Sequence, residues 1–288
     1  PQKQGFACAF CKCTAGRPRR AVPARGPAER QQLTEPLRTI LPGLIVFMTT
    51  FQQGITGFGC TVLALPFVVL LLGMDVAVKV MVLQATILST YIVVTSRRHI
   101  VWREYGHIAA YALAGLPLGM ILYRVLPEAW LKGVLGVFMA GVAIQGLHGQ
   151  ARRIRPAAVE RGTAAARLMD GCLVLGGLLH GAFGAGGPCV VIYAARAIPD
   201  KSLFRVTLSV VWLTLNALMI TRWVATGAIT PEVQLQAAIC APFTLAGVIG
   251  GDHLHHRVNE FAFRTLVFTV LLLSGLAVLY AAASGPKG

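Results

Sequence analysis

The chain has 288 residues, of which 56% are apolar and 13% are charged, and its mean hydropathy is +0.67. Soluble domains are about a quarter charged, and a chain of this length cannot enclose so much apolar surface in one soluble core. The net charge of +15 lies in segments between apolar runs, so it indicates the cytoplasmic loops of an all-α integral membrane protein and not a nucleic-acid-binding face.

The N-terminal segment, residues 1–36, is rich in Arg, Pro, Ala and Gly. This composition is typical of a disordered chain, so we expect a disordered basic tail that ends at about Glu35. Cys8, Cys11 and Cys13 have the spacing of metal ligands, but no second Cys or His pair follows nearby in the sequence to complete four ligands. We therefore predict no metal site and no cofactor.

From residue 37 onward, apolar runs recur in two sets of five, separated by a basic linker at 149–167. The first set lies at 37–53, 61–73, 76–96, 105–125 and 130–148, and the second at 168–181, 188–198, 203–225, 232–252 and 261–283. A glycine cluster follows the first run of each set at a constant spacing of 127 residues: Gly54, Gly57 and Gly59, then Gly181, Gly184 and Gly186. These equivalences predict two tandem transmembrane repeats, 37–148 and 168–284, each of about four spans with a glycine-broken first helix.

The clusters at 54–59 and 181–187 interrupt apolar stretches that are too long for one straight span and too broken for one helix. A break at membrane depth frees backbone N–H and C=O groups, which is tolerable only where they face protein or a watery cavity. Two equivalent breaks therefore predict a transporter site near the membrane midplane, where helix N-termini attract anions. The alternative is glycine used only for close helix packing, which we expect at two other pairs spaced by four residues: Gly115 with Gly119, and Gly247 with Gly251.

Charged and polar side chains near these clusters indicate the sign of the substrate. No carboxylate lies in the middle of an apolar run, which argues against a cation pathway. Lys79 and Arg205 lie a few residues inside the third run of each set, where each either snorkels to the interface or binds an anion. His180 precedes its cluster as Gln53 precedes the other, so it is either a packed histidine or a pH-sensitive ligand contact. The candidate substrate-binding residues are Gln53, Gly54, Thr56, Gly57, Gly59, Lys79, Gln84, His180, Gly181, Gly184, Gly186, Gly187, Arg205 and Asn216.

The duplicated pattern resembles the TauE/SafE sulfite exporter family over about residues 37–283. The pattern combines a glycine-rich break after the first run, Pro66 or Pro188 shortly after it, a basic turn after the next run and a fourth segment with glycines spaced by four. It departs from the family at Cys60, where the cluster would continue with Gly. The resemblance implies an inner-membrane permease of about eight spans that moves sulfite, an organosulfonate or a related anion.

Several alternatives stay open at this stage. The positive-inside bias favours an inverted second repeat and nine spans, whereas the family resemblance favours four plus four. A transporter of another solute, either a metal ion or a thiosulfate-like ion bound through Cys60 and Cys189, and a membrane assembly factor are the rival functions. We do not expect an enzyme, because the one histidine cluster, at 253–256, lies in a basic loop and no H-E-x-x-H motif is present in the sequence. The expected partners are a small anionic solute and membrane lipid, and homo-oligomer formation is left open.

Overall fold

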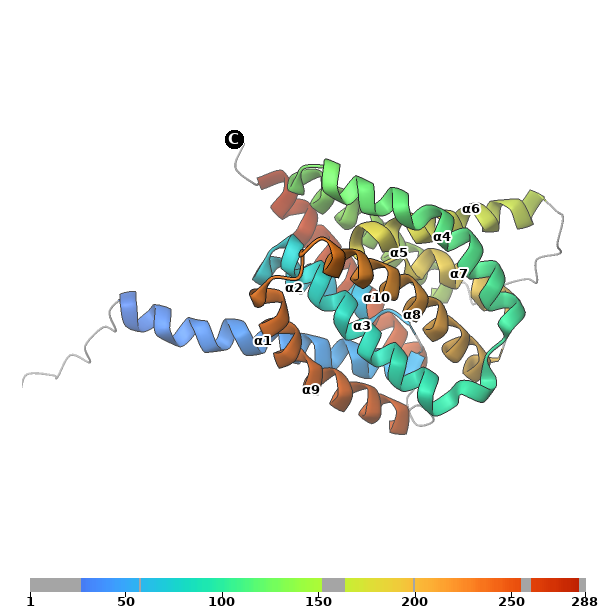
Figure 1. The fold of residues 1–288 in the computed structure, drawn as a ribbon, viewed down its shortest axis with the longest axis horizontal. Helices are drawn as coiled ribbons and strands as arrows, with labels where there is room; N and C mark the ends of the chain where they lie inside the picture. Colours follow the sequence, from blue (N-terminus) through green and yellow to red (C-terminus); the bar gives the residue numbers. More distant parts are fainter. Residues whose placement is uncertain (1–26, 57, 152–163, 199, 255–259, 285–288) are drawn as a thin grey trace, which may run out of the picture. The chain divides into compact units, whose positions relative to one another are not determined.

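A computed structural model describes residues 27–56, 58–151, 164–198, 200–254 and 260–284. Within these ranges the chain is helical and contains no strand, which confirms the all-α prediction (Figure 1). The helices are α1 Pro27–Thr56, α2 Cys60–Leu72, α3 Met74–Ser96, η1 Arg97–His99, α4 Trp102–Val125, α5 Glu128–Ala151, α6 Ala164–Phe183, α7 Gly187–Ala197, α8 Lys201–Ala225, α9 Pro231–Leu254 and α10 Glu260–Ser284.

Five segments are long and apolar enough to cross a membrane. They are α3 with η1, α4, residues Ala129–Gly149 of α5, α8 and α9. Shorter apolar helices lie in α1, α2 and α10. Large apolar side chains such as Met48, Val94, Leu118 and Val137 are exposed on the outer faces, as expected for surfaces that contact lipid.

The chain divides into two compact units, residues 1–36 and 37–288. The described part of the first unit is helical from Pro27, within the segment 1–36 for which the composition predicts a disordered tail. Proline suits the first position of a helix, and the Ala, Glu, Arg and Gln residues that follow have high helix propensity. The rest of the predicted tail, with its three cysteines, lies outside the described residues.

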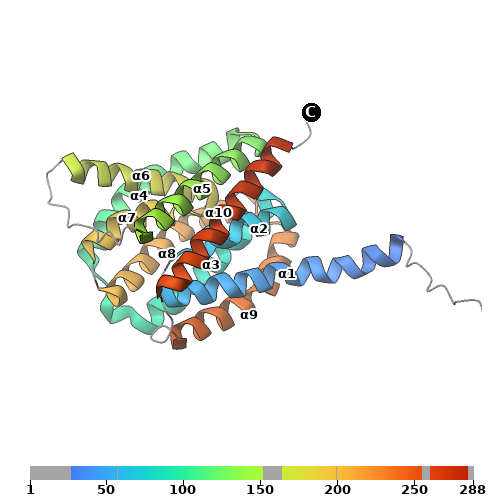
Figure 2. The ribbon, with the colours of Figure 1, turned by 180° about the vertical axis from the view of Figure 1, so that it is seen from behind.

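In the second unit, α3 and α8 form the centre and run in opposite directions. They pack against each other, α3 also packs against α9, and α8 also packs against α4 (Figure 1). The backbone N–H of Val101, just after the end of α3, donates to Thr207 Oγ1 near the start of α8 at 3.0 Å. More than half of each of these two apolar segments is buried, compared with about a third of the other three. On another side of the unit, α5 packs along α10 (Figure 2).

Glycines bring α4 and α6 into backbone contact. A side chain at Gly115 would overlap the Val174 carbonyl group, and one at Gly119 would overlap the Leu178 carbonyl group. The same arrangement recurs between α9 and α1, where a side chain at Gly251 would overlap the Phe51 carbonyl oxygen. The predicted role of these spaced glycines in close helix packing is confirmed.

The α4–α6 contact gives a prediction for two glycines on one helix. We expect Gly119→Ala to lower the stability of the protein by about 1–3 kcal/mol, because the new methyl group meets backbone atoms that cannot move aside. Gly106→Ala is the matched control, since no atom lies within 4 Å of the added carbon and alanine favours a helix. Thermal unfolding of the purified variants in detergent measures both effects, and equal unfolding midpoints would contradict the assignment.

Candidate functional site

Both glycine clusters break a helix. The first break separates the end of α1 at Thr56 from the start of α2 at Cys60, and the second separates the end of α6 from the start of α7. Gly59 has a φ of 104° and Gly184 a φ of 65°, a left-handed conformation that side chains rarely adopt. The Gly184 N–H donates to the His180 carbonyl oxygen at 2.7 Å and closes the last turn of α6.

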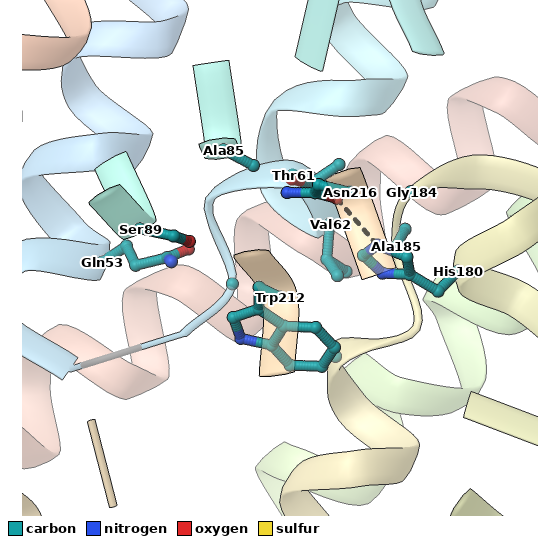
Figure 3. A pocket seen from close by; sticks show the side chains of 12 residues that line it. Gln53, Thr61, Val62, Ala85, Ser89, His180, Gly184, Ala185, Trp212 and Asn216 are labelled. Carbon is teal, nitrogen blue, oxygen red and sulfur yellow. Dashed lines mark hydrogen bonds between the residues drawn. The ribbon is translucent and has the colours of Figure 1, made fainter. Parts of the chain in front are cut away.

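The two breaks line one small pocket (Figure 3). The lining residues are Gln53, Gly59, Thr61 and Val62 from the first break, His180, Gly184, Ala185 and Gly187 from the second, Ala85 and Ser89 from α3, and Trp212 and Asn216 from α8. The cavity volume is about 30 Å³, more than the roughly 10–15 Å³ that one buried water needs. The pocket therefore has room for a species of a few heavy atoms.

His180 is held in the pocket wall by two residues of α8. Its Nε2 lies 2.9 Å from Asn216 Oδ1, and because an amide oxygen only accepts, the ring donates this hydrogen bond. Its ring stacks on the Trp212 indole, with centroids 5.4 Å apart and an interplanar angle of 15°. Only 3% of His180 is exposed and Asn216 is fully buried, so the packing of α8 against α6 fixes the direction of both side chains.

Three buried polar atoms of the pocket lack a hydrogen-bond partner in the part of the chain that the structure describes. They are Ser89 Oγ, His180 Nδ1 and Asn216 Nδ2. A buried polar atom without a partner costs roughly 1–3 kcal/mol, and native proteins seldom carry three in one place without a ligand or water to satisfy them. Figure 3 shows His180 and Asn216 on one side of the pocket and Gln53 and Ser89 on the other.

Helices α2 and α7 both begin at the pocket. The N-terminus of a helix carries partial positive charge. At the start of α2, Gln53 Oε1 accepts the Cys60 N–H at 2.7 Å, which leaves the Gln53 amide nitrogen as the donor of that side chain. Among the described lining residues, no side chain carries a fixed charge and only His180 can change its charge. No group of three or more metal-binding side chains occurs within the described residues.

Several predicted site residues lie outside this pocket. Gln84 donates to the Ala237 carbonyl oxygen at 2.9 Å and accepts from Thr244 Oγ1 at 2.7 Å, so it links α3 to α9. Gly54 packs against Gly251 on α9. Gly181 packs against the α4 backbone, Gly186 packs against Gly176, and Thr56 ends α1. Gly57 lies outside the described residues.

Lys79 and Arg205 also lie away from the pocket, and each has a carboxylate partner. Lys79 Nζ lies 2.6 Å from Asp75 Oδ2 on the same helix, and Arg205 Nη1 lies 2.6 Å from Asp252 Oδ1 on α9. Both aspartates lie near the ends of their helices, so each cation is paired with a carboxylate outside the middle of an apolar run. Asp75 is one turn away along α3, and the last turn of α9 brings Asp252 to the start of α8.

Six lining residues were not among the predicted site residues: Thr61, Val62, Ala85, Ser89, Ala185 and Trp212. Two of them, Ser89 and Trp212, could have been found from the sequence. Trp212 lies one helical turn before Asn216, so the two share a face of α8. Ser89 precedes Asn216 by 127 residues, the same spacing that relates the two glycine clusters. Both spacings can be read from the sequence, but they point to the pocket only once Asn216 is known to line it.

The ion pairs give a prediction about stability. We expect Asp252→Asn to destabilise the protein by roughly 1–3 kcal/mol, because Asp252 is only 35% exposed and joins α9 to the buried Arg205 side chain of α8. Asp75→Asn is the matched control, with an expected loss of at most about 1 kcal/mol, because the Asp75 side chain is 61% exposed. Thermal unfolding of the two variants compares them, and equal losses would contradict the difference in burial.

The comparison with known families covers the whole of this site. The profile of the sulfite exporter TauE/SafE family matches residues 43–278, a range that contains both helix breaks, every lining residue of the pocket and both ion pairs. No curated protein and no solved structure matches the chain. Because the match covers most of the sequence and agrees with the apolar helices, this membrane protein belongs to the sulfite exporter TauE/SafE family, a family of transporters.

Proposed function

We propose that the protein is a permease for a small inorganic oxyanion of the size of sulfite, and that the pocket between the two helix breaks is its binding site. The observation that carries this proposal is the set of unpartnered polar atoms on Ser89, His180 and Asn216 in a pocket without a carboxylate. An oxyanion accepts hydrogen bonds from amide, hydroxyl and backbone donors, and two helix N-termini add partial positive charge.

The size of the pocket supports an inorganic anion over an organosulfonate. A cavity of about 30 Å³ holds roughly two water-sized groups, so an inorganic oxyanion needs less widening of it than an organosulfonate, which needs additional space for its carbon chain. Drug-sized organic ligands occupy pockets of about 300–1,000 Å³. Among the anions that the sequence suggested, sulfite and its inorganic relatives therefore fit this conformation best.

The proposal includes a duplicated architecture with inverted halves, 37–148 and 168–284. Corresponding helix ends keep the spacing of 127 residues: α1 and α6 end at Thr56 and Phe183, α2 and α7 begin at Cys60 and Gly187, and α3 and α8 begin at Met74 and Lys201. The pocket residues pair in the same way, as Gln53 with His180, Ala85 with Trp212, and Ser89 with Asn216. The opposite directions of α3 and α8 support inversion over a parallel repeat.

Inverted halves suit a carrier because they give the two sides of the membrane equivalent access routes. When a binding site lies between inverted repeats, a rearrangement of one half opens the site to one side, and the equivalent rearrangement of the other half opens it to the opposite side. The near-central positions of Ser89 in α3 and Asn216 in α8 support such a site.

The rival functions have less support. Cys60 and Cys189, the residues on which a thiosulfate or metal carrier would rely, are not among the lining residues, and the Cys60 thiol lies 3.7 Å from the Thr61 hydroxyl. A membrane assembly factor has no need for a pocket of unpartnered polar atoms.

Asn216 and Gln84 provide the test, because both are fully buried amides of the central helices. Replacing Asn216 with Leu keeps the side-chain volume and removes the donor in the pocket, so we expect sulfite to bind about 10–100-fold more weakly to a protein that still folds. Gln84→Leu is the control: it removes the link to α9, and we expect lower thermal stability with the same sulfite affinity. Uptake of [35S]sulfite into proteoliposomes and equilibrium binding to purified protein measure these effects.

Two outcomes would contradict the proposal. The first is an unchanged sulfite affinity in folded Asn216→Leu protein. The second is parent protein that neither binds nor transports sulfite, sulfate or thiosulfate in the same assays.

A further inference from the structure

We infer that His180 couples anion transport to protons: the ring takes up one proton when the anion binds and releases it when the anion leaves. This inference rests on the proposed function, because it assigns a coupling ion to the same pocket. It begins from three observations. His180 lines the pocket, its Nδ1 has no partner among the described residues, and its Nε2 bonds to Asn216.

The hydrogen-bond capacity of the His180–Asn216 pair depends on its proton count. When the ring is neutral and donates through Nε2 to Asn216 Oδ1, its Nδ1 presents a lone pair to the pocket. If the amide is turned over, Nδ1 carries the proton but Asn216 then presents its oxygen. In either arrangement the neutral pair offers one donor and one acceptor, and the acceptor repels an oxyanion.

A protonated ring removes this conflict. His180 then donates through both nitrogens, Asn216 Oδ1 accepts from Nε2, and Asn216 Nδ2 remains a donor to the pocket. The pair thus presents two donors and one positive charge to the anion. The reverse also holds, since a buried imidazolium without a counter-charge is costly and the anion supplies that charge. Anion and proton therefore each strengthen the binding of the other by the same factor.

The surroundings of His180 leave the anion as its counter-charge. The segments of α2 and α7 that pack near it contribute the Cys60 and Cys189 thiols, and the part of α4 that faces it, 112–120, has no titratable side chain. The charged side chains of α3 and α8 are Asp75, Lys79, Lys201, Arg205 and Arg222, and none of them lines the pocket. Lys79 and Arg205 are each paired with an aspartate. No carboxylate lines the pocket within the described chain.

Trp212 provides the other partner for a charged ring. Its indole face lies against the imidazole, with centroids 5.4 Å apart, inside the roughly 6 Å over which a cation is attracted to an aromatic face. The equivalent position in the other half holds Gln53, which carries no charge at any pH. The side of the pocket that carries His180 can therefore change its charge with pH, and the side that carries Gln53 cannot.

The coupled cycle conserves protons. On the loading side, His180 takes a proton from water and the anion binds against the charged ring. After the site opens to the other side, the anion leaves and the ring returns the proton to water. One proton then moves with each anion in the same direction, so a pH gradient drives the anion towards the alkaline side.

The test compares the parent with His180→Gln, the residue that the equivalent position carries, and with the exposed control His253→Gln. Sulfite itself also takes up a proton near neutral pH. Dividing the sulfite affinity of the parent by that of His180→Gln removes this contribution, because it is the same for both proteins. We expect this affinity ratio to fall about tenfold per pH unit above the pH at which the His180 ring of the anion-free parent is half protonated, as linkage to one proton requires. We also expect a pH gradient to drive sulfite accumulation in proteoliposomes with the parent and His253→Gln, and to drive less with His180→Gln.

The outcomes separate this inference from the proposed function. If His180→Gln transports sulfite with the pH profile and gradient dependence of the parent, the coupling is wrong and the permease stands. If the parent neither binds nor transports sulfite, sulfate or thiosulfate at any pH, both are wrong. A second measurement avoids any change at His180: in a protein with Trp102, Trp130 and Trp223 replaced by Phe, the pH-dependent quenching of Trp212 should shift to higher pH when sulfite is added. An unshifted midpoint would also overturn the coupling.

Discussion

The structure depends on one constraint: inside a membrane, a backbone N–H or C=O group that leaves a helix must find a partner other than lipid. Two helix breaks would be unstable apart, because each exposes such groups at its glycine cluster. Side by side, they share a small polar space in which the Gln53 side chain accepts one amide and the His180 carbonyl oxygen accepts another. The requirement that makes the breaks meet also creates the polar pocket that we propose as the permease site.

The remaining interactions keep this pocket free of fixed charge. Lys79 and Arg205 are neutralised near the starts of α3 and α8 by their aspartates, away from the lining residues. Gly181, the neighbour of His180, packs on the α4 backbone, so the position of His180 depends on a contact that excludes side chains. Under the proposed function, the only charges that appear in the pocket are those that the substrate and His180 bring.

Apolar runs predicted the helices well, because each run is bounded by glycine, proline or charge. The run predicted at 203–225 is α8 at 201–225, and the glycine clusters marked both breaks. The partners across helices could not be predicted in the same way. A serine or tryptophan inside an apolar run, such as Ser89 or Trp212, has no distinguishing pattern until the facing helix is known. The pairing of Arg205 with Asp252 likewise depends on how α8 and α9 pack.

The glycine contacts join helices from opposite halves of the chain, since α1 packs on α9 and α6 packs on α4. The site of contact for α1 near Phe51 is Gly251, 200 residues later in the sequence. During synthesis the first broken helix can make this contact only after nearly the whole chain has been inserted. Long-range contacts of this kind make folding slow. A chain without α9 would therefore leave the end of α1, directly before its break, without the glycine face on which it packs.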